Sequence, residues 1–343
     1  MEKEIQNISE NNTKNKSNRH KKRLLTLLLL LTVTGVMLGT STYAWFTSNK
    51  TVSVNDIKVN VAAQNGIQMS VDGTNWKTII QTTDITSAKT TYSTAVNQLP
   101  ATLKPVSTGK NIDSSGKMEM YLGAIESNEA GQNVLTATKS TETDGVSGDF
   151  VAFDLFVKVD ADTTAYMTPT SGVSVSTGST DLGIKNASRM GFVILGHADS
   201  GSALADIQSL NAGTSSVAKI WEPNYDVHTA AGVSNAYDVY GITTSQTGGS
   251  ALAYNGVIAP ITLGDNVLLN SSAADYFKAV TPDYKTTNAF ADQFEFLTFT
   301  KGITKVRVYM WIEGQDVDCE NAASGTDVTF RIQLTTIEPT AGE

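Results

Sequence analysis

Hydrophobic and polar residues alternate with a period of two in three long segments of the chain. In 151–159 the hydrophobic phase holds Val151, Phe153, Leu155, Val157 and Val159, and the other phase includes Asp154 and Lys158. In 305–314 the inward phase is Val306, Val308, Met310 and Ile312, and the outward phase is Arg307, Tyr309, Trp311 and Glu313. In 327–338 the hydrophobic phase is Val328, Phe330, Ile332 and Leu334. Because successive side chains of a strand point to opposite faces of a sheet, this alternation predicts half-buried strands.

Turn and helix signals complete the expected fold. Asp72-Gly73 lies between two apolar alternations in 67–80 and suits a hairpin turn that needs positive φ. Helical periodicity is weak, and the best candidates for short helices are 202–210 and 271–280. The pattern predicts an all-β fold, a two-sheet β-sandwich with loop and short-helix insertions.

No Pro-rich stretch or block of like charge divides the chain into halves. We therefore expect residues 45–343 to form a single domain. Within this domain, residues from about 180 to 290 could form a lobe that is inserted between core strands.

The first 44 residues have the features of an export signal. Residues 1–23 form a polar, basic head that ends in Lys21, Lys22 and Arg23, and a compact apolar run follows from Leu24 to Met37. Thr42 and Ala44 fit the small-x-small rule for cleavage. We therefore predict that 24–44 is the apolar and cleavage region of a signal peptide, and that signal peptidase cuts after Ala44 to leave Trp45 as the new N-terminus.

An uncleaved anchor is the alternative for this segment. The stretch from Leu24 to Phe46 is just long enough to cross a bilayer, and Tyr43, Trp45 and Phe46 could form an aromatic belt at its surface. Either way the rest of the chain is expected to be exported. If the signal is cleaved, the protein meets the membrane only through this segment and only before cleavage.

Charge is distributed unevenly along the chain. The first 23 residues hold seven of the 25 Lys and Arg residues, so residues 24–343 hold 18 basic and 31 acidic residues, a net charge of −13. An acidic surface repels phosphate backbones, which argues against nucleic-acid binding. It also helps to keep crowded copies of the chain soluble.

Candidate catalytic residues are sparse. The chain has no HExxH motif, and His197 and His228 are the two histidines beyond the signal. Both are expected to be structural or surface residues, so we predict that the protein is not an enzyme. The single cysteine, Cys319, has no partner for an intrachain disulfide. It is expected at a loop edge, with an intermolecular disulfide as the alternative.

A weak calcium candidate follows the second alternating segment. Asp316, Asp318 and Glu320 lie at alternate positions and Asp327 follows, and carboxylate oxygens at such spacing can bind Ca²⁺. The sixth position of an EF-type loop needs Gly, and Asn321 stands there. A solvated acidic hairpin loop without a metal or cofactor is therefore the expected structure.

The head, the segment STYAWFTSN (41–49) and the alternating strands resemble the TasA and camelysin family of exported bacterial fibre proteins. Two further segments, GDFVAFDLFVKV (148–159) and VRVYMWIEGQDVDC (306–319), look like those of Firmicutes surface proteins with the same head. The resemblance implies a jelly-roll-like β-sandwich. It also implies an extracellular or biofilm-matrix location, and subunits that polymerise by lending an N-terminal strand to a neighbour.

The residues that follow Ala44 contain a change of phase. Apolar positions run through Phe46, Val52 and Val54, and then through Ile57, Val59 and Val61 in the opposite phase, with the slip at Asn55-Asp56. A one-residue slip moves side chains to the other face of a sheet, so two strands or a bulge must meet there. Residues 45–54 are therefore a candidate donor strand for the sheet edge of the next subunit. Pairing of this segment within its own chain is the alternative.

Two functional classes remain from the sequence. The first is a structural subunit of an extracellular filament or surface layer, whose main partner is a second copy of the chain. The second is a monomeric surface or secreted module that binds a glycan or a protein through Trp221, Pro223 and Tyr225.

Overall fold

The computed structural model describes residues 57–64, 66–127, 133–175, 183–233, 262–263, 277, 280–286, 295–319 and 327–338. The predicted signal segment, its cleavage residues Thr42 and Ala44, the whole of 45–54 and Glu320 lie outside the described residues. Most of the candidate helix at 271–280 lies outside them too. Within the described ranges, no helix has both the length and the apolar character needed to span a membrane.

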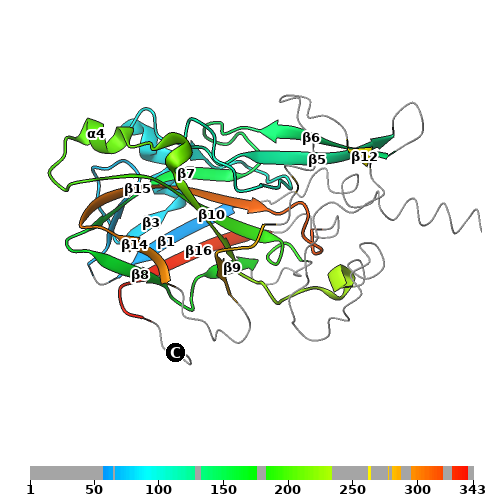
Figure 1. The fold of residues 1–343 in the computed structure, drawn as a ribbon. Helices are drawn as coiled ribbons and strands as arrows, with labels where there is room; N and C mark the ends of the chain where they lie inside the picture. Colours follow the sequence, from blue (N-terminus) through cyan, green and yellow to red (C-terminus); the bar gives the residue numbers. More distant parts are fainter. Residues whose placement is uncertain are drawn as a thin grey trace, which may run out of the picture. The chain divides into compact units, whose positions relative to one another are not determined.

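The first large sheet combines strands from early, middle and late parts of the chain (Figure 1). They are β1 (Ile57–Ala63), β3 (Ile79–Gln81), β8 (Thr163–Met167), β9 (Gly172–Val175), β14 (Glu295–Phe299) and β16 (Val328–Thr335). Their order is β14-β8-β16-β1-β3, with β9 also paired to β16. β1 runs parallel to β16 along its whole length, from Ile57 opposite Val328 to Ala63 opposite Leu334.

The alternation predicted for the last strand is confirmed. In β16 the residues Val328, Phe330, Ile332 and Leu334 are buried, whereas Arg331 between them is exposed. This strand therefore has one face toward the core and one toward solvent, as the period of two requires.

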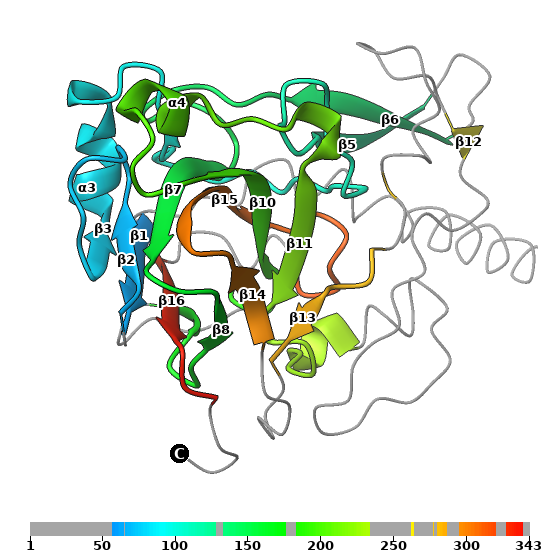
Figure 2. The same cartoon turned by 60° about the vertical axis from the view of Figure 1, so that its left-hand side comes forward.

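The second large sheet contains the other two alternating segments. Its described strands are β2 (Gln68–Ser70), β4 (Asn97–Gln98), β7 (Val151–Val159), β10 (Ser188–Ala198), β11 (Val217–Glu222), β13 (Tyr284–Lys285) and β15 (Gly302–Ile312). Their order is β13-β11-β10-β15-β7-β2, with β4 also paired to β7. Figure 2 shows β10 between β15 and β11. β10 and β11 fall in the range considered for an inserted lobe, so this part of the range belongs to the main sheet.

The two large sheets share one hydrophobic core. It includes Val61, Ile80, Phe330 and Leu334 from the first sheet and Phe153, Val157, Val308 and Met310 from the second. Burial of apolar side chains between two sheets is what holds a β-sandwich together. The chain is therefore mostly β, with two large mixed sheets packed in sandwich fashion.

A third layer covers the outer face of the second sheet. A smaller sheet of β5 (Met120–Ser127), β6 (Asn133–Ser140) and β12 (Thr262–Leu263) belongs to it. Met118 and Met120 at the start of this layer pack with Ala152, Tyr309 and Trp311 of the second sheet. The prediction of half-buried strands is therefore wrong for β7 and β15, because both faces of these strands are covered; all eleven residues of β15 are buried.

Polar residues on the covered face of β15 bind carboxylates of β7 and of the segment after β6 instead of meeting solvent. Arg307 Nε donates to Asp154 Oδ1 at 2.7 Å, and Arg307 Nη1 donates to Glu142 Oε2 at 3.0 Å. The Tyr309 hydroxyl donates to the other oxygen of Glu142. Buried charges are tolerated when they are paired and hydrogen-bonded, so this network allows an alternating sequence to lie between two layers.

The positive-φ turn predicted at Asp72-Gly73 is confirmed, but the predicted hairpin is limited to one antiparallel bridge between Met69 and Lys77. Gly73 has φ 76°, and Met69 and Lys77 exchange two backbone hydrogen bonds of 2.7 Å across the loop. The two arms then separate, because β2 joins the second sheet and β3 joins the first.

Short helices lie between the strands. The predicted helix at 202–210 is confirmed as α4 (Leu204–Ser209), which Figure 1 shows at one end of the sandwich. Other short helices are α3 (Thr82–Ser87), η1 (Ala88–Thr90) and η2 (Gly213–Ser215), and the described residues 230–233 are helical as well. α3 follows β3 directly, so the chain leaves the edge of the first sheet at Thr82.

Candidate functional site

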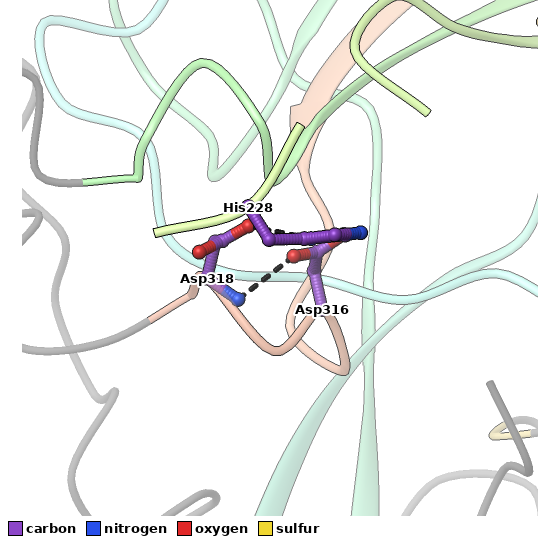
Figure 3. A group of neighbouring side chains, drawn as sticks. All are labelled: His228, Asp316 and Asp318. Atoms are coloured by element: carbon purple, nitrogen blue, oxygen red, sulfur yellow. Dashed lines mark hydrogen bonds and ion pairs between the residues drawn. The ribbon is translucent and has the colours of Figure 1, made fainter. Parts of the chain in front are cut away.

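A cluster of buried charged residues lies at the end of the second sheet where β15 finishes and β10 begins. We call it the His–Asp cluster; it comprises Arg189 of β10, Glu222 of β11, His228, Asp316 and Asp318. Figure 3 shows three of its members, His228, Asp316 and Asp318, side by side.

The turn after β15 brings the two aspartates together. The backbone N–H of Asp316 donates to the carbonyl of Glu313 at 3.1 Å, and that of Cys319 donates to the carbonyl of Asp316 at 3.0 Å. The N–H of Asp318 donates to Asp316 Oδ1 at 2.8 Å (Figure 3). Asp316 is 8% exposed and Asp318 is 0% exposed. The expectation of a solvated acidic loop is therefore wrong, because the turn folds inward against residues that follow β11.

His228 and its neighbours enclose the Asp318 carboxylate. His228 Nδ1 lies 2.9 Å from Asp318 Oδ2. Thr229 donates to Asp318 Oδ1 twice, from its backbone N–H at 2.8 Å and from its hydroxyl at 2.7 Å. A Cβ atom on Gly232 would lie 2.3 Å from Asp318 Oδ1, so this position has no room for a side chain.

Arg189 joins the cluster to both neighbouring strands. Its Nη2 lies 2.5 Å from Asp316 Oδ2 and 2.7 Å from Glu222 Oε1. Its Nη1 donates to the carbonyls of Asn186 and Ser188, at 2.8 and 3.0 Å. One guanidinium thus connects β10, β11 and the turn after β15, which its fixed fork of donors allows.

Burial and mutual repulsion shift the protonation of the cluster. Burial raises the pKa of Glu222 to about 7, and repulsion from Asp316 adds to this although Arg189 opposes it. Burial also raises the pKa of Asp316, against the attraction of Arg189. Burial alone would lower the pKa of His228, but the hydrogen bond to Asp318 and the nearby carboxylates raise it overall. Burial is thus the main cause of the raised pKa values of the two carboxyls, whereas the neighbouring carboxylates are the cause for His228.

The structure brings only part of the calcium candidate together. Within the described residues, one group has ligand atoms arranged for a metal ion: His228, Asp316 and Asp318, whose atoms lie within 4.8 Å of one another. Asp327 is described but does not belong to this group, and Glu320 is outside the described residues. An imidazole therefore joins two of the predicted carboxylates. The chain spacing of 90 residues between His228 and Asp318 left no local signal for this pairing.

The other singled-out polar residues have structural surroundings. His197 lies on β10, with Nδ1 3.4 Å from the Thr304 hydroxyl of the neighbouring strand. Cys319 ends the turn after β15, as expected of a residue at a loop edge, but it is fully buried and belongs to the hydrophobic core. Burial raises the pKa of its thiol well above the usual range, which disfavours the reactive thiolate.

The aromatic cluster proposed for ligand binding is not an exposed platform. Trp221 is 0% exposed, and its Nε1 donates to the Thr286 hydroxyl at 3.0 Å. Pro223 is buried too. Tyr225 is partly exposed, and Lys285 Nζ lies 4.0 Å from its ring centroid. A glycan cannot stack on Trp221 without opening the sheet.

Fold and site together define a β-sandwich protein with a covering third layer and a buried cluster of one histidine and two aspartates. Comparison of the chain with protein-family models, with curated proteins and with solved structures gave no match.

Proposed function

We propose that the protein is an exported, non-enzymatic subunit of an extracellular filament or surface layer, which assembles by donating residues 45–54 to a neighbouring copy. The observation that carries this proposal is the pairing of β1, the strand that follows the donor segment. β1 pairs with β16 over seven residues but with β3 only at Asn60–Ala62. Among the described residues, 57–59 have no strand partner on the β3 side.

The geometry of β3 accounts for this unpaired length. β3 ends at Gln81, and the chain turns into α3 at Thr82 instead of continuing along β1. An unpaired strand edge presents N–H and C=O groups that can accept a strand from another chain. The donor segment precedes this edge directly in sequence, so the same region of the subunit can supply a strand and receive one.

The sequence supports the remaining parts of the proposal. The basic head and the apolar run favour export and cleavage by signal peptidase after Ala44, with a retained membrane anchor as the alternative. The segment STYAWFTSN (41–49) supports membership of the TasA and camelysin family, and with it a jelly-roll-like β-sandwich. The acidic body suits a protein that is exported at high concentration and must assemble only through specific contacts.

The second candidate function is a monomeric module that binds a ligand through Trp221, Pro223 and Tyr225. Trp221 is buried, so it is not available to bind a ligand at the surface. The donor-strand proposal does not depend on any exposed aromatic residue. We therefore favour the filament subunit.

Two purified chains test the proposal, one that starts at Trp45 and one that starts at Asp56. We expect filaments by negative-stain electron microscopy from the first chain and folded monomers from the second. Filaments from the chain that starts at Asp56 would show that 45–54 is not the connector. Failure of that chain to fold, measured by circular dichroism, would show instead that 45–54 completes the subunit's own sheet.

A further inference from the structure

The His–Asp cluster has features that no part of the filament proposal uses. We propose that His228, Asp316 and Asp318 bind one divalent metal ion, of which Zn²⁺ is the best match, and that this ion fastens the turn after β15 to the segment after β11. The proposal is independent of residues 45–54 and of polymerisation.

The positions of the ligand atoms support a single ion. The candidate atoms of the three residues lie within 4.8 Å of one another, and His228 Nδ1 and Asp318 Oδ2 are 2.9 Å apart. Ligands held at about 2.0–2.2 Å from Zn²⁺ lie roughly 3 to 3.5 Å from each other. The cluster is therefore close to the required size. Closing the remaining gap requires the Asp316 carboxylate to move from its contacts with Arg189 and with the Asp318 N–H.

The surroundings of His228 suit a metal ligand. Its side chain is 8% exposed, and Nδ1 lies 2.9 Å from Asp318 Oδ2. An ion held by these two atoms takes the place of the proton between them, because a histidine binds a metal through a deprotonated nitrogen. Nε2, on the opposite edge of the ring, is buried without a hydrogen-bond partner among the described residues.

The local charge favours a cation. Glu222, Asp316 and Asp318 provide three buried carboxylates, and Arg189 is the one side chain of the cluster that is always cationic. A divalent ion would supply the missing positive charge in a place from which water is largely excluded. Binding would also join two segments that are far apart in the sequence.

The donor types select the metal. Ca²⁺ and Mg²⁺ prefer sites made only of oxygen ligands, whereas imidazole nitrogen together with carboxylate oxygen suits Zn²⁺. In the sequence, the carboxylates alone made a weak calcium candidate, and a loop without a metal was the expectation. His228 changes the expected ion.

The test uses the full chain in detergent, prepared without a polyhistidine tag and stripped with a chelator. Zn²⁺ is titrated by isothermal calorimetry, with Ca²⁺ in parallel, and bound metal is counted by elemental analysis. His228→Gln is compared with His197→Gln, a matched control on β10. We expect one Zn²⁺ per chain in the wild type and in His197→Gln. We expect at least tenfold weaker binding in His228→Gln.

Several results would overturn the proposal. They are a wild-type chain that takes up no Zn²⁺, a His228→Gln chain that binds Zn²⁺ as tightly as the wild type, and a wild-type chain that binds Ca²⁺ but not Zn²⁺. If His228→Gln does not fold, X-ray absorption of the Zn²⁺-loaded wild type replaces it. Imidazole scattering would support the assignment, and its absence would refute it.

Discussion

Arg307 and Asp154 face each other across the paired strands β15 and β7, with Arg307 Nε donating to Asp154 Oδ1 at 2.7 Å. Their side chains are 8% and 0% exposed. Carboxylates around Arg307 keep its pKa high in spite of burial, so the guanidinium remains charged beneath the third layer. Because both charges are compensated by this ion pair, the two strands can lie buried between two layers.

Removal of one partner of this pair should be costly. We expect Asp154→Ala to lower the free energy of unfolding by about 3–5 kcal/mol, because it leaves part of a buried cation uncompensated. Urea unfolding of the chain measures this change. Lys77→Ala, which breaks an exposed ion pair with Asp84, should cost less than about 1 kcal/mol. Equal losses in the two variants would mean that Arg307 is compensated without Asp154.

Low pH should lower the stability of the fold through the turn at Asp72. Burial alone would raise the pKa of Asp72, but hydrogen bonds from Thr91, Asn75, Thr74 and Ser70 hold it well below its ordinary value. A carboxyl with a depressed folded-state pKa stabilises the fold above its unfolded pKa of about 3.9, and this contribution is lost as the pH falls toward the folded value.

Asp72→Asn should therefore be less stable than the wild type at pH 6, and the difference should shrink between pH 4 and pH 2. Thermal melting of both chains across this range measures the effect. A difference that stays constant with pH would show that the Asp72 carboxylate has no such linkage.

Gly232 should not tolerate a side chain. Its Cβ would lie 2.3 Å from Asp318 Oδ1, so Gly232→Ala must displace the enclosed carboxylate. We expect a loss of at least about 2 kcal/mol in the free energy of unfolding. Gly201 has no atom within 4 Å of the corresponding position, and Gly201→Ala should stay within about 1 kcal/mol of the wild type. Similar stabilities for both variants would contradict the close packing around Asp318.

Charged substitutions in the donor segment should prevent filament formation only on the face that holds Val52 and Val54. Val52→Asp combined with Val54→Asp should abolish filaments and leave the body folded, because each buried apolar side chain contributes roughly 1.5–3 kcal/mol at the junction. The matched control is Ser53→Asp, which adds a charge on the alternate face and should retain filaments. Electron microscopy reads out assembly, and circular dichroism confirms folding. Loss of filaments in Ser53→Asp as well would point to a general effect of charge.

Export should produce a chain that begins at Trp45. N-terminal sequencing of the exported protein tests this directly, because Thr42 and Ala44 place the cut between Ala44 and Trp45. A product that retains residues 24–44 would favour the anchor.

The alternation of apolar and polar residues predicted the strands β7, β15 and β16. It could not show whether solvent or another layer covers each face of a strand. Arg307 and Tyr309 resemble outward residues in sequence, and they are buried because Glu142 and the third layer, distant in the chain, fold over them. The same limit applies to the site. Asp316 and Asp318 stood out through their spacing, whereas His228 gave no local sign that it belongs with them, because tertiary packing alone brings it to Asp318.

The parallel pairing of β1 with β16 joins the first described strand to the last. Neighbours so far apart in sequence raise the contact order of the fold, and closing such a long loop is slow. The first sheet cannot close around β1 until β16 has left the ribosome, because β1 pairs with β16 along its whole length. A newly made chain therefore lacks its complete first sheet until that point, which suits the export that we propose.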